Sequence, residues 1–437
     1  MKPEFEAIYR EKLTTAAEAV KIVRSGDRVS FGTNSSVAYN LMRALYDRLD
    51  ELEQVTIVGS NVYKPLEIMS GKDPRVQLCS YFVGTAEREA LAHGNHNVDY
   101  TSFHLSQIDV WVKQVARPTV SFIEVSLPDE DGYMSYGASG VCLTQYAVDC
   151  SDRIVLSVNP NAPYVLGESN RIHVSQADWI VEDDEPIFMV DDAPADGPTA
   201  QIGRILIDEI HDGDCIQLGI GGVANVVGYG LIEKNDLSCH SEMMSNSIMH
   251  LMQNGNITNR RKKFHPGKTT CSFSMGSREL YDFLDHNEDM YFAPMPVINN
   301  PAVIAMNDNA VSINNALAVD LYGQVAADNL GGRQYSSIGG QVDFVRGVQM
   351  SKGGRSYIAL NSTFESKTTG RKGSKIVPCL TGPVGTSRAD VQYVVTEYGC
   401  VNLKVLPMRE RVHAMISIAH PDFRAELTQE AKRLNMI

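Results

Sequence analysis

The chain of 437 residues lacks several features that would assign it to particular classes of protein. It has no run of 18 consecutive apolar residues, so we expect no transmembrane helix. Its first 15 residues are charged throughout and lack the apolar core of a signal peptide, which favours a cytoplasmic protein. The eight cysteines include no Cys-x-x-Cys pair, so we expect free thiols and no metal site.

The chain also lacks an excess of basic residues. Lys and Arg number 39 against 53 Asp and Glu, which gives a net charge of −14. This balance argues against a general binder of nucleic acids or of anionic membranes, because either surface attracts a net basic face. Hydrophobic residues make up 43% and charged residues 21%, as in ordinary globular proteins. At about 150 residues per domain, the length predicts two or three domains.

The chain does contain an internal echo, that is, a short sequence pattern that occurs twice. Residues 25–32 read Ser-Gly-Asp-Arg-Val-Ser-Phe-Gly, and residues 212–219 read Asp-Gly-Asp-Cys-Ile-Gln-Leu-Gly. In each copy a helical pattern leads to a Gly-Asp pair, and a short strand then runs to a glycine. Gly26 and Gly213 are typical of helix ends, where glycine accepts the left-handed conformation. The predicted helices are 16–23 and 202–210, with hydroxyl caps expected from Thr14 or Thr15 and from Thr199.

The two copies predict a duplicated α/β fold. The acidic, proline-containing stretch 182–198 separates them and resembles an interdomain linker. We therefore expect two similar α/β domains in tandem, with largely parallel sheets. The predicted boundaries are 1–185 for the first domain, 186–198 for the linker and 199–437 for the second domain.

Short runs of branched apolar residues recur along both halves, with helical patterns between several of them. This alternation favours α/β layers. A surface helix is expected over 421–434. The predicted strands are 55–58, 110–112, 154–158, 216–218, 358–360 and 393–396.

The segment after the second copy of the echo is rich in glycine. A strand ends at Gly219, and a helix is predicted over 223–232, so backbone N–H groups can approach an anionic ligand. The pattern Gly219-x-Gly221-x-x-Ala224 also fits the dinucleotide fingerprint, with Glu242 placed where an acid would hold a ribose hydroxyl. An NAD-binding oxidoreductase and an ordinary packed turn are both consistent with this segment.

Two further segments carry candidate chemistry. Glu242 lies among small and apolar residues, and such a carboxylate is either a nucleophile or a structural hydrogen-bond acceptor. The Gly339-Gly340-Gln341 segment and the amides of Asn314-Asn315 are able to present donors to a developing oxyanion, although turns have the same composition.

Basic residues near the C-terminus are candidate partners of a phosphate. Lys375 and Arg388 are either such partners or members of surface ion pairs. The basic run 260–263 is most simply a solvated loop, and otherwise a contact to a phosphorylated cofactor.

Taken in order, these segments resemble the acetyl-CoA hydrolase/transferase family of class I CoA-transferases, and in particular its 4-hydroxybutyrate and butyrate:acetate CoA-transferases. The resemblance extends over essentially the whole chain. The motifs that carry it are GIGGVAN (219–225), HSEMMS (240–245), SINNALAVDLYGQ (312–324), SSIGGQVDFVRG (336–347), SKIVP (374–378), TSRADV (386–391) and VTEYG (395–399), with SLPDEDGYMSYG (126–137) in the first half.

The resemblance implies a site in the cleft between the two domains and a catalytic role for Glu242. Its carboxylate would attack an acyl-CoA, and CoA would then be held as a glutamyl-CoA thioester in a ping-pong mechanism. The implied substrates are acyl-CoA and short-chain carboxylates, with butyryl-CoA and acetate first and 4-hydroxybutyrate next. No tightly bound cofactor is implied, and the family suggests a homodimer or homotetramer.

The resemblance also suggests roles for individual residues. Gly221, Gly222, Gly339 and Gly340 are expected to donate backbone hydrogen bonds, with Asn314 as a side-chain donor near the acyl group. Gln341, Lys375 and Arg388 are expected to bind CoA.

One departure from the family pattern follows the glutamate, where Asn246-Ser247 replaces the usual Asp-Gly. A second follows Gly32, where the loop Thr-Asn-Ser-Ser-Val-Ala lacks a proline. Both departures are expected to face the acyl group of the substrate.

Three other functions stay open at this point. The same glutamate would serve an acyl-CoA hydrolase, in which water replaces the acceptor carboxylate. An NAD-binding oxidoreductase accounts for the Gly219 fingerprint but leaves the Gly339-Gly340-Gln341 segment unexplained. A non-catalytic CoA-binding protein is the third.

Overall fold

The computed structural model describes residues 1–94, 97–192, 194–366 and 369–437. The contacts within the chain divide it into two compact units. The first comprises Met1–Asp191 and Thr270–Ile298, and the second comprises Asp192–Thr269 and Asn299–Ile437. The chain first passes from one unit to the other inside the predicted linker 186–198, of which Ala193 lies outside the described residues.

The excursion of residues 270–298 into the first unit differs from the predicted division at 199. Backbone hydrogen bonds hold this segment: Phe292 N donates to Leu166 O at 2.8 Å, and Glu168 N donates to Phe292 O at 2.9 Å. Gly167 makes this approach possible, because a Cβ there would lie 1.9 Å from Phe292 O. Pairing between residues more than 120 positions apart leaves no local signal in the sequence.

The first unit is built on a seven-stranded sheet in which every neighbouring pair is parallel. Its central strands are buried along their length, as expected of a parallel sheet covered on both faces. The strands, in spatial order, are β11 (Trp179–Glu182), β9 (Arg153–Val158), β7 (Val120–Val125), β1 (Arg28–Ser30), β4 (Val55–Val58), β5 (Val76–Ser80) and β6 (Val98–Tyr100).

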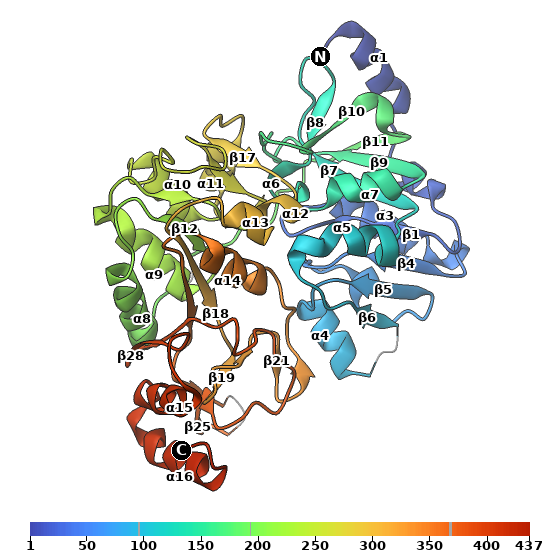
Figure 1. Cartoon of the computed structure of the whole chain (residues 1–437). Coiled ribbons are helices and arrows are strands. Elements are labelled where there is room, and N and C mark those ends of the chain that lie inside the picture. The colour runs from blue at the N-terminus through green and yellow to red at the C-terminus, as the bar shows by residue number, and fades with distance from the viewer. Residues whose placement is uncertain (95–96, 193, 367–368) are drawn as a thin grey trace. The chain divides into compact units, whose positions relative to one another are not determined.

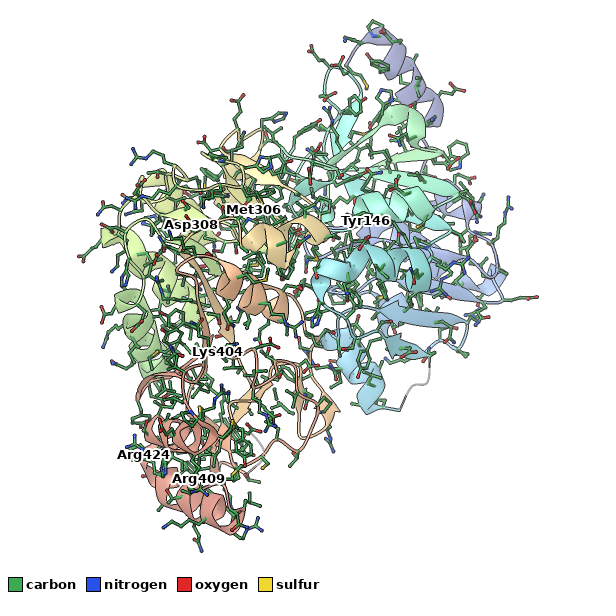
Figure 2. The ribbon with its side chains drawn as sticks, viewed as in Figure 1. Tyr146, Met306, Asp308, Lys404, Arg409 and Arg424 are labelled. Carbon is green, nitrogen blue, oxygen red and sulfur yellow. The ribbon has the colours of Figure 1, made fainter. Side chains whose placement is uncertain are left out.

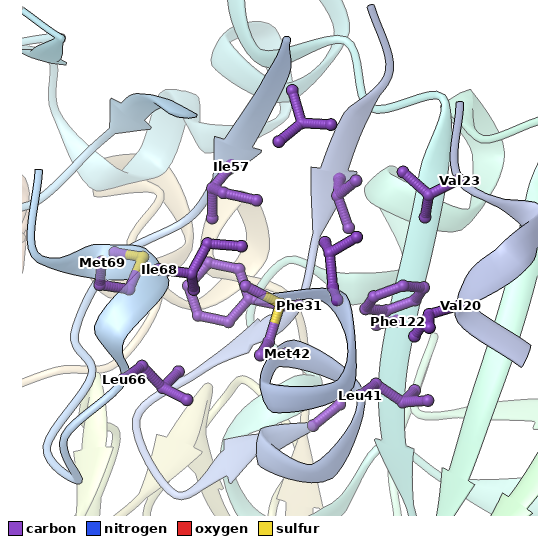
Figure 3. Close-up of a cluster of buried hydrophobic side chains, with 14 of the residues drawn as sticks. Val20, Val23, Phe31, Leu41, Met42, Ile57, Leu66, Ile68, Met69 and Phe122 are labelled. Carbon is purple, nitrogen blue, oxygen red and sulfur yellow. The ribbon is translucent and has the colours of Figure 1, made fainter. Parts of the chain in front are cut away.

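Helices cover this sheet, and Figure 1 shows α5 and α7 on the face toward the viewer. The core between sheet and helices contains Phe31, Met42 and Phe122, all fully buried (Figure 3). Burial of each such side chain contributes roughly 1.5–3 kcal/mol. The helices are α1 (Pro3–Lys12), α2 (Ala16–Ala19), α3 (Tyr39–Asp47), α4 (Thr85–Ala92), α5 (Ile108–Trp111), α6 (Gly137–Gly140), α7 (Thr144–Cys150), α11 (Arg278–Leu284) and α12 (Met295–Ile298).

The second unit contains a six-stranded sheet that is parallel except for its last pair. A small sheet of β20 (Val325–Ala326), β19 (Ala318–Asp320) and β26 (Ile376–Val377) accompanies it. The strands of the large sheet, in spatial order, are β13 (Ser238–Cys239), β12 (Cys215–Leu218), β18 (Ala310–Asn315), β23 (Arg355–Ala359), β27 (Tyr393–Thr396) and β28 (Gly399–Asn402).

Helices and a second core complete this unit. Val345, Val394 and Met415 are fully buried in that core. Figure 2 labels Arg409, a residue of α15, and Arg424, a residue of α16. The helices are α8 (Gly197–Asp208), α9 (Gly222–Gly230), α10 (Asn246–Gln253), α13 (Pro301–Ile304), α14 (Gln341–Met350), α15 (Met408–Ser417) and α16 (Pro421–Arg433). Among the residues that the structure describes, no helix combines the length and the apolar character needed to cross a membrane.

The topology of the two sheets repeats. The order β11-β9-β7-β1-β4 in the first unit corresponds to β27-β23-β18-β12-β13 in the second, and β1 and β12 are the two copies of the sequence echo. The repeat extends to one buried ion pair: Asp27 binds Arg153 at 2.6 Å, and Asp214 binds Arg355. Each aspartate directly precedes its strand, β1 or β12, and each arginine begins the strand two places away in the same sheet, β9 or β23. The ion pair therefore joins corresponding elements in the two units.

Two local predictions are wrong. Residues 110–112, predicted as a strand, are helical. The buried side chains follow the spacing of one helix face, which is not visible within a run of three apolar residues; they are Ile108, Trp111, Val112 and Ala116. The cap of α8 is Asp196, whose Oδ1 accepts from Thr199 N at 2.7 Å. Thr199 follows Pro198, which occupies the first turn of the helix.

Candidate active site

The candidate site lies at the carboxyl ends of the parallel strands of the second unit. In open α/β sheets, ligands bind at this edge. The chain leaves β12, β13 and β18 there, and the resulting loops contact one another. Ser241 Oγ donates to Leu218 O at 3.1 Å, and Asn315 Nδ2 donates to Ile220 O at 3.4 Å.

Glu242 is the charged centre of this site. It comes three residues after β13, and Asn299 Nδ2 donates to its Oε2 at 2.5 Å. Gly340 lies against the same oxygen: a Cβ at Gly340 would be 1.8 Å from Glu242 Oε2 and 2.3 Å from Asn299 Nδ2. A larger residue at position 340 would therefore displace the ends of both side chains. The structure thus brings together Glu242, Asn299 and Gly340 from three separate segments.

The surroundings of Glu242 make its carboxylate unusually basic. Burial raises the pKa of Glu242 to about 7, with a further rise from the negative charge of Asp343, whereas the hydrogen bond from Asn299 opposes the shift. Near neutral pH the group is therefore divided between its acid and its ionised form. In its ionised form such a carboxylate is able to act as a nucleophile.

Asn299 was not among the residues predicted from the sequence. It is fully buried, and its Oδ1 has no hydrogen-bond partner within the part of the chain that the structure describes. The neighbouring Asn300 caps α13 by accepting from Ala302 N at 2.9 Å. One asparagine is enough for that cap, so the doubled Asn-Asn before Pro301 was the available signal that Asn299 serves another purpose.

The two predicted glycine segments have different environments. Gly221 has φ +109°, a backbone conformation that favours glycine. Space does not require glycine there, because no atom would lie within 4 Å of an added Cβ. Gly222 begins α9 and packs against Thr199 of α8. Of the four predicted glycines, Gly340 directly contacts Glu242, and Gly339 immediately precedes it with φ +63°.

The predicted side-chain ligands are occupied by contacts within the chain. Asn314 Nδ2 donates to Gln217 Oε1 at 3.2 Å. Gln341 Nε2 donates to Asn315 O at 2.8 Å, and Gln341 Oε1 accepts from Thr386 Oγ1 at 2.7 Å. Both ends of the Gln341 amide are thus bonded inside the protein, and its contact to CoA stays a prediction.

The two predicted phosphate partners lie in different surroundings. Lys375 is half-buried, and burial lowers the pKa of its ammonium, while Glu397 and Asp196 act in the opposite direction. Arg388 is exposed, with its guanidinium 5.4 Å from the centre of the Tyr322 ring. Their contact to CoA stays a prediction.

The basic run 260–263 is paired within the unit. Arg260 and Arg261 bind Asp236, and Lys263 binds Asp308 at 2.8 Å. Lys262 is buried and donates to two backbone carbonyls. Internal pairing of this kind accounts for the basic run without a cofactor.

Residues 246 and 247 fit the packing of helices. Asn246 Nδ2 donates to Asp192 Oδ1 at 3.2 Å. Ser247 packs against α9, where a Cβ at Gly228 would lie 2.2 Å from Ser247 Oγ. Ser247 thus contributes to the packing of α9 against α10, and the expected contact of the two residues to an acyl group stays a prediction.

Comparison with known proteins gives matches along both units. Residues 1–191 match the family model of the acetyl-CoA hydrolase/transferase N-terminal domain, and residues 276–431 match that of the C-terminal domain. The chain is 39% identical to a 4-hydroxybutyrate coenzyme A transferase from Clostridium kluyveri, over 98% of this chain and 99% of that protein. It is 36% identical to a butyryl-CoA:acetate CoA-transferase from Anaerostipes caccae, over 98% of each. The crystal structure of RipA from Yersinia pestis matches with a TM-score of 0.91 and 34% identity, over 99% of this chain and all of that one.

Proposed function

Because the chain belongs to the acetyl-CoA hydrolase/transferase family, we propose that it is a CoA-transferase that moves CoA between short-chain carboxylates through Glu242. The observation that carries the proposal is the contact of the Glu242 carboxylate with the Asn299 amide and the Gly340 backbone. A half-buried carboxylate with a raised pKa beside a donor has the chemistry of a covalent nucleophile.

In the proposed first half-reaction, a carboxylate oxygen of Glu242 attacks the thioester carbonyl carbon of the acyl-CoA. The C–S bond breaks, which leaves a mixed anhydride on Glu242 and a CoA thiolate. The thiolate then attacks the glutamyl carbonyl carbon, the C–O bond of the anhydride breaks, and the first carboxylate departs. The product is a glutamyl-CoA thioester.

The second half-reaction runs the same steps in reverse. The acceptor carboxylate attacks the glutamyl-CoA carbonyl and releases the thiolate, which then attacks the acceptor's acyl carbon. This yields the new acyl-CoA and regenerates the Glu242 carboxylate. No proton is gained or lost over the cycle, and the expected kinetics are ping-pong.

Each step develops a negative oxygen that needs hydrogen-bond donors. We assign Asn299 Nδ2 and the backbone of the Gly339-Gly340 turn to this task, because Asn299 and Gly340 lie against the carboxylate. Gly221, Gly222 and Asn314 stay predicted donors near the acyl group. Loss of one oxyanion donor costs about 3 kcal/mol in known enzymes.

The substrates we propose are butyryl-CoA with acetate as acceptor, or 4-hydroxybutyrate. They rest on the names of two relatives that match the whole chain. The alternative, hydrolysis of acyl-CoA by the same glutamate, needs water in place of the acceptor carboxylate. Exclusion of water from the carboxylate favours transfer. A cytoplasmic homodimer or homotetramer that holds CoA through Lys375 and Arg388 stays a prediction.

The test is to trap CoA on the enzyme. After incubation with butyryl-CoA, borohydride is expected to reduce the glutamyl thioester, and peptide mass spectrometry is expected to find the change at Glu242. The matched control is Glu242→Gln, which keeps the size of the side chain and removes the nucleophile. Trapping at another residue, or full transfer activity in Glu242→Gln, would refute the assignment. Thiol release that does not depend on acetate would favour the hydrolase.

A further inference from the structure

Gln341 links its own segment, which adjoins Glu242, to two other segments of the second unit. It is the first residue of α14 and directly follows Gly340, which lies against the carboxylate. Its amide donates to Asn315 O at 2.8 Å and accepts from Thr386 Oγ1 at 2.7 Å. Gln341 is 8% exposed and Thr386 is fully buried, so solvent does not compete for these bonds.

The Gly339-Gly340 turn has no side chain of its own to hold it in place. Glycine loses more conformational freedom on folding than any other residue, and Gly339 has φ +63°. The position of the turn must nevertheless be accurate, because the carboxylate oxygen is in contact with Gly340. The next residue that is able to anchor the turn by side-chain hydrogen bonds is Gln341.

Both partners of Gln341 are themselves held by regular structure. Asn315 is the last residue of β18, and the following residue, Ala316, bonds through its N–H to Ala359 O at 3.1 Å. Thr386 is bonded in both directions to Val325 of β20, at 3.0 and 3.3 Å. The Gln341 amide therefore spans two fixed points on two different sheets.

We propose that Gln341 is a positioning residue: its amide, held between the Asn315 carbonyl and the Thr386 hydroxyl, fixes the Gly339-Gly340 turn against the Glu242 carboxylate. The proposal rests on the proposed function of Glu242. It replaces the contact to CoA that the sequence suggested for Gln341. Glutamine is needed because its amide must reach both partners, and asparagine is one methylene shorter.

Two variants remove the link in different ways. Gln341→Asn keeps the amide but cannot span both partners, and Thr386→Val keeps the shape but removes the hydroxyl. A displacement of about 1 Å at a reacting group costs up to about 100-fold in rate. We therefore expect kcat to fall between about 10- and 100-fold in each variant, with the KM for acyl-CoA changed by less than about threefold.

Conservative and remote variants separate positioning from stability. Thr386→Ser retains the hydroxyl and is expected to keep kcat within about threefold of the wild type. Ser351→Ala removes a hydroxyl that donates to Asn307 O at 2.6 Å at the far end of the same helix. It is expected to lower the thermal unfolding temperature but to leave kcat unchanged. The double variant Gln341→Asn/Thr386→Val is expected to be no slower than the slower single variant, because both changes break one linkage.

Three results would overturn the proposal. The first is a normal kcat in folded Gln341→Asn and Thr386→Val. The second is a raised KM for acyl-CoA at unchanged kcat, which would return Gln341 to CoA binding. The third is additive losses in the double variant. Failure of the proposed function is recognised separately, because Glu242→Gln would then retain transfer and no label would appear at Glu242.

Discussion

Replacement of Gly340 by alanine tests the geometry of the site most directly. The added Cβ would lie 1.8 Å from Glu242 Oε2 and 2.3 Å from Asn299 Nδ2, and neither distance is physically allowed. To reach an ordinary contact of 3.4 Å, the carboxylate must move by about 1.6 Å. Gly340 has φ −90° and ψ 5°, which alanine also adopts, so backbone strain does not contribute.

The displacement sets the expected magnitude. A misplacement of about 1 Å costs on the order of 100-fold in rate, which corresponds to about 2.7 kcal/mol of activation free energy. We therefore expect Gly340→Ala to lower the kcat of CoA transfer by at least that factor. The assay is acetate-dependent formation of acetyl-CoA from butyryl-CoA, with borohydride trapping to measure the glutamyl-CoA intermediate.

The control lies in the same helix. A Cβ at Gly347 would meet Ile304 side-chain atoms from 2.7 Å, so Gly347→Ala overpacks the core without reaching Glu242. This variant is expected to lose roughly 1–3 kcal/mol of unfolding free energy and to retain its kcat. A Gly340→Ala enzyme with kcat within threefold of the wild type would refute the reasoning.

Four further predictions follow from burial and charge. Transfer activity should rise with pH through about 7, because the proposed nucleophile is the ionised form of Glu242; a rate independent of pH between 5.5 and 8.5 would contradict this. Because the pKa of Glu242 is higher in the folded than in the unfolded chain, ionisation of this group lowers the stability of the fold as the pH rises above the unfolded-state pKa. Glu242→Gln removes this cost and should raise the unfolding temperature more at pH 8 than at pH 5. Arg355→Met leaves the buried Asp214 carboxylate unpaired and should cost about 3–5 kcal/mol in urea unfolding, whereas Arg346→Met, at an exposed pair, should cost less than about 1 kcal/mol. Phe31→Ala should cost about 3–5 kcal/mol, and a loss below about 1 kcal/mol would contradict the packing of that core.

Much of the fold could be read from local patterns. The resemblance to the family is confirmed by models that match both halves of the chain. The strands at Val55–Val58 and Tyr393–Thr396 have the predicted bounds, because buried parallel strands form short apolar runs between turn residues. The two Gly-Asp turns mark the same strand in two sheets of the same order.

The wrong strand came from a pattern that allows two explanations. Residues 110–112 resemble a strand over three positions, and only the spacing over nine residues shows the helix. The return of residues 270–298 to the first unit depends on pairing with distant residues near 166–168, which composition does not signal.

The sequence by itself determined the α/β class and the repeat and singled out Glu242 as a candidate, because these depend on periodicity, on glycine at turns and on motifs that are contiguous in the chain. The tertiary structure alone decided which groups touch that glutamate. Asn299 and Gly340 lie 57 and 98 positions after Glu242 and reach it only when the parallel strands align their carboxyl ends. It also supplied the hydrogen-bond partners of the Gln341 amide, which the sequence does not contain, because those partners lie in distant segments of the chain.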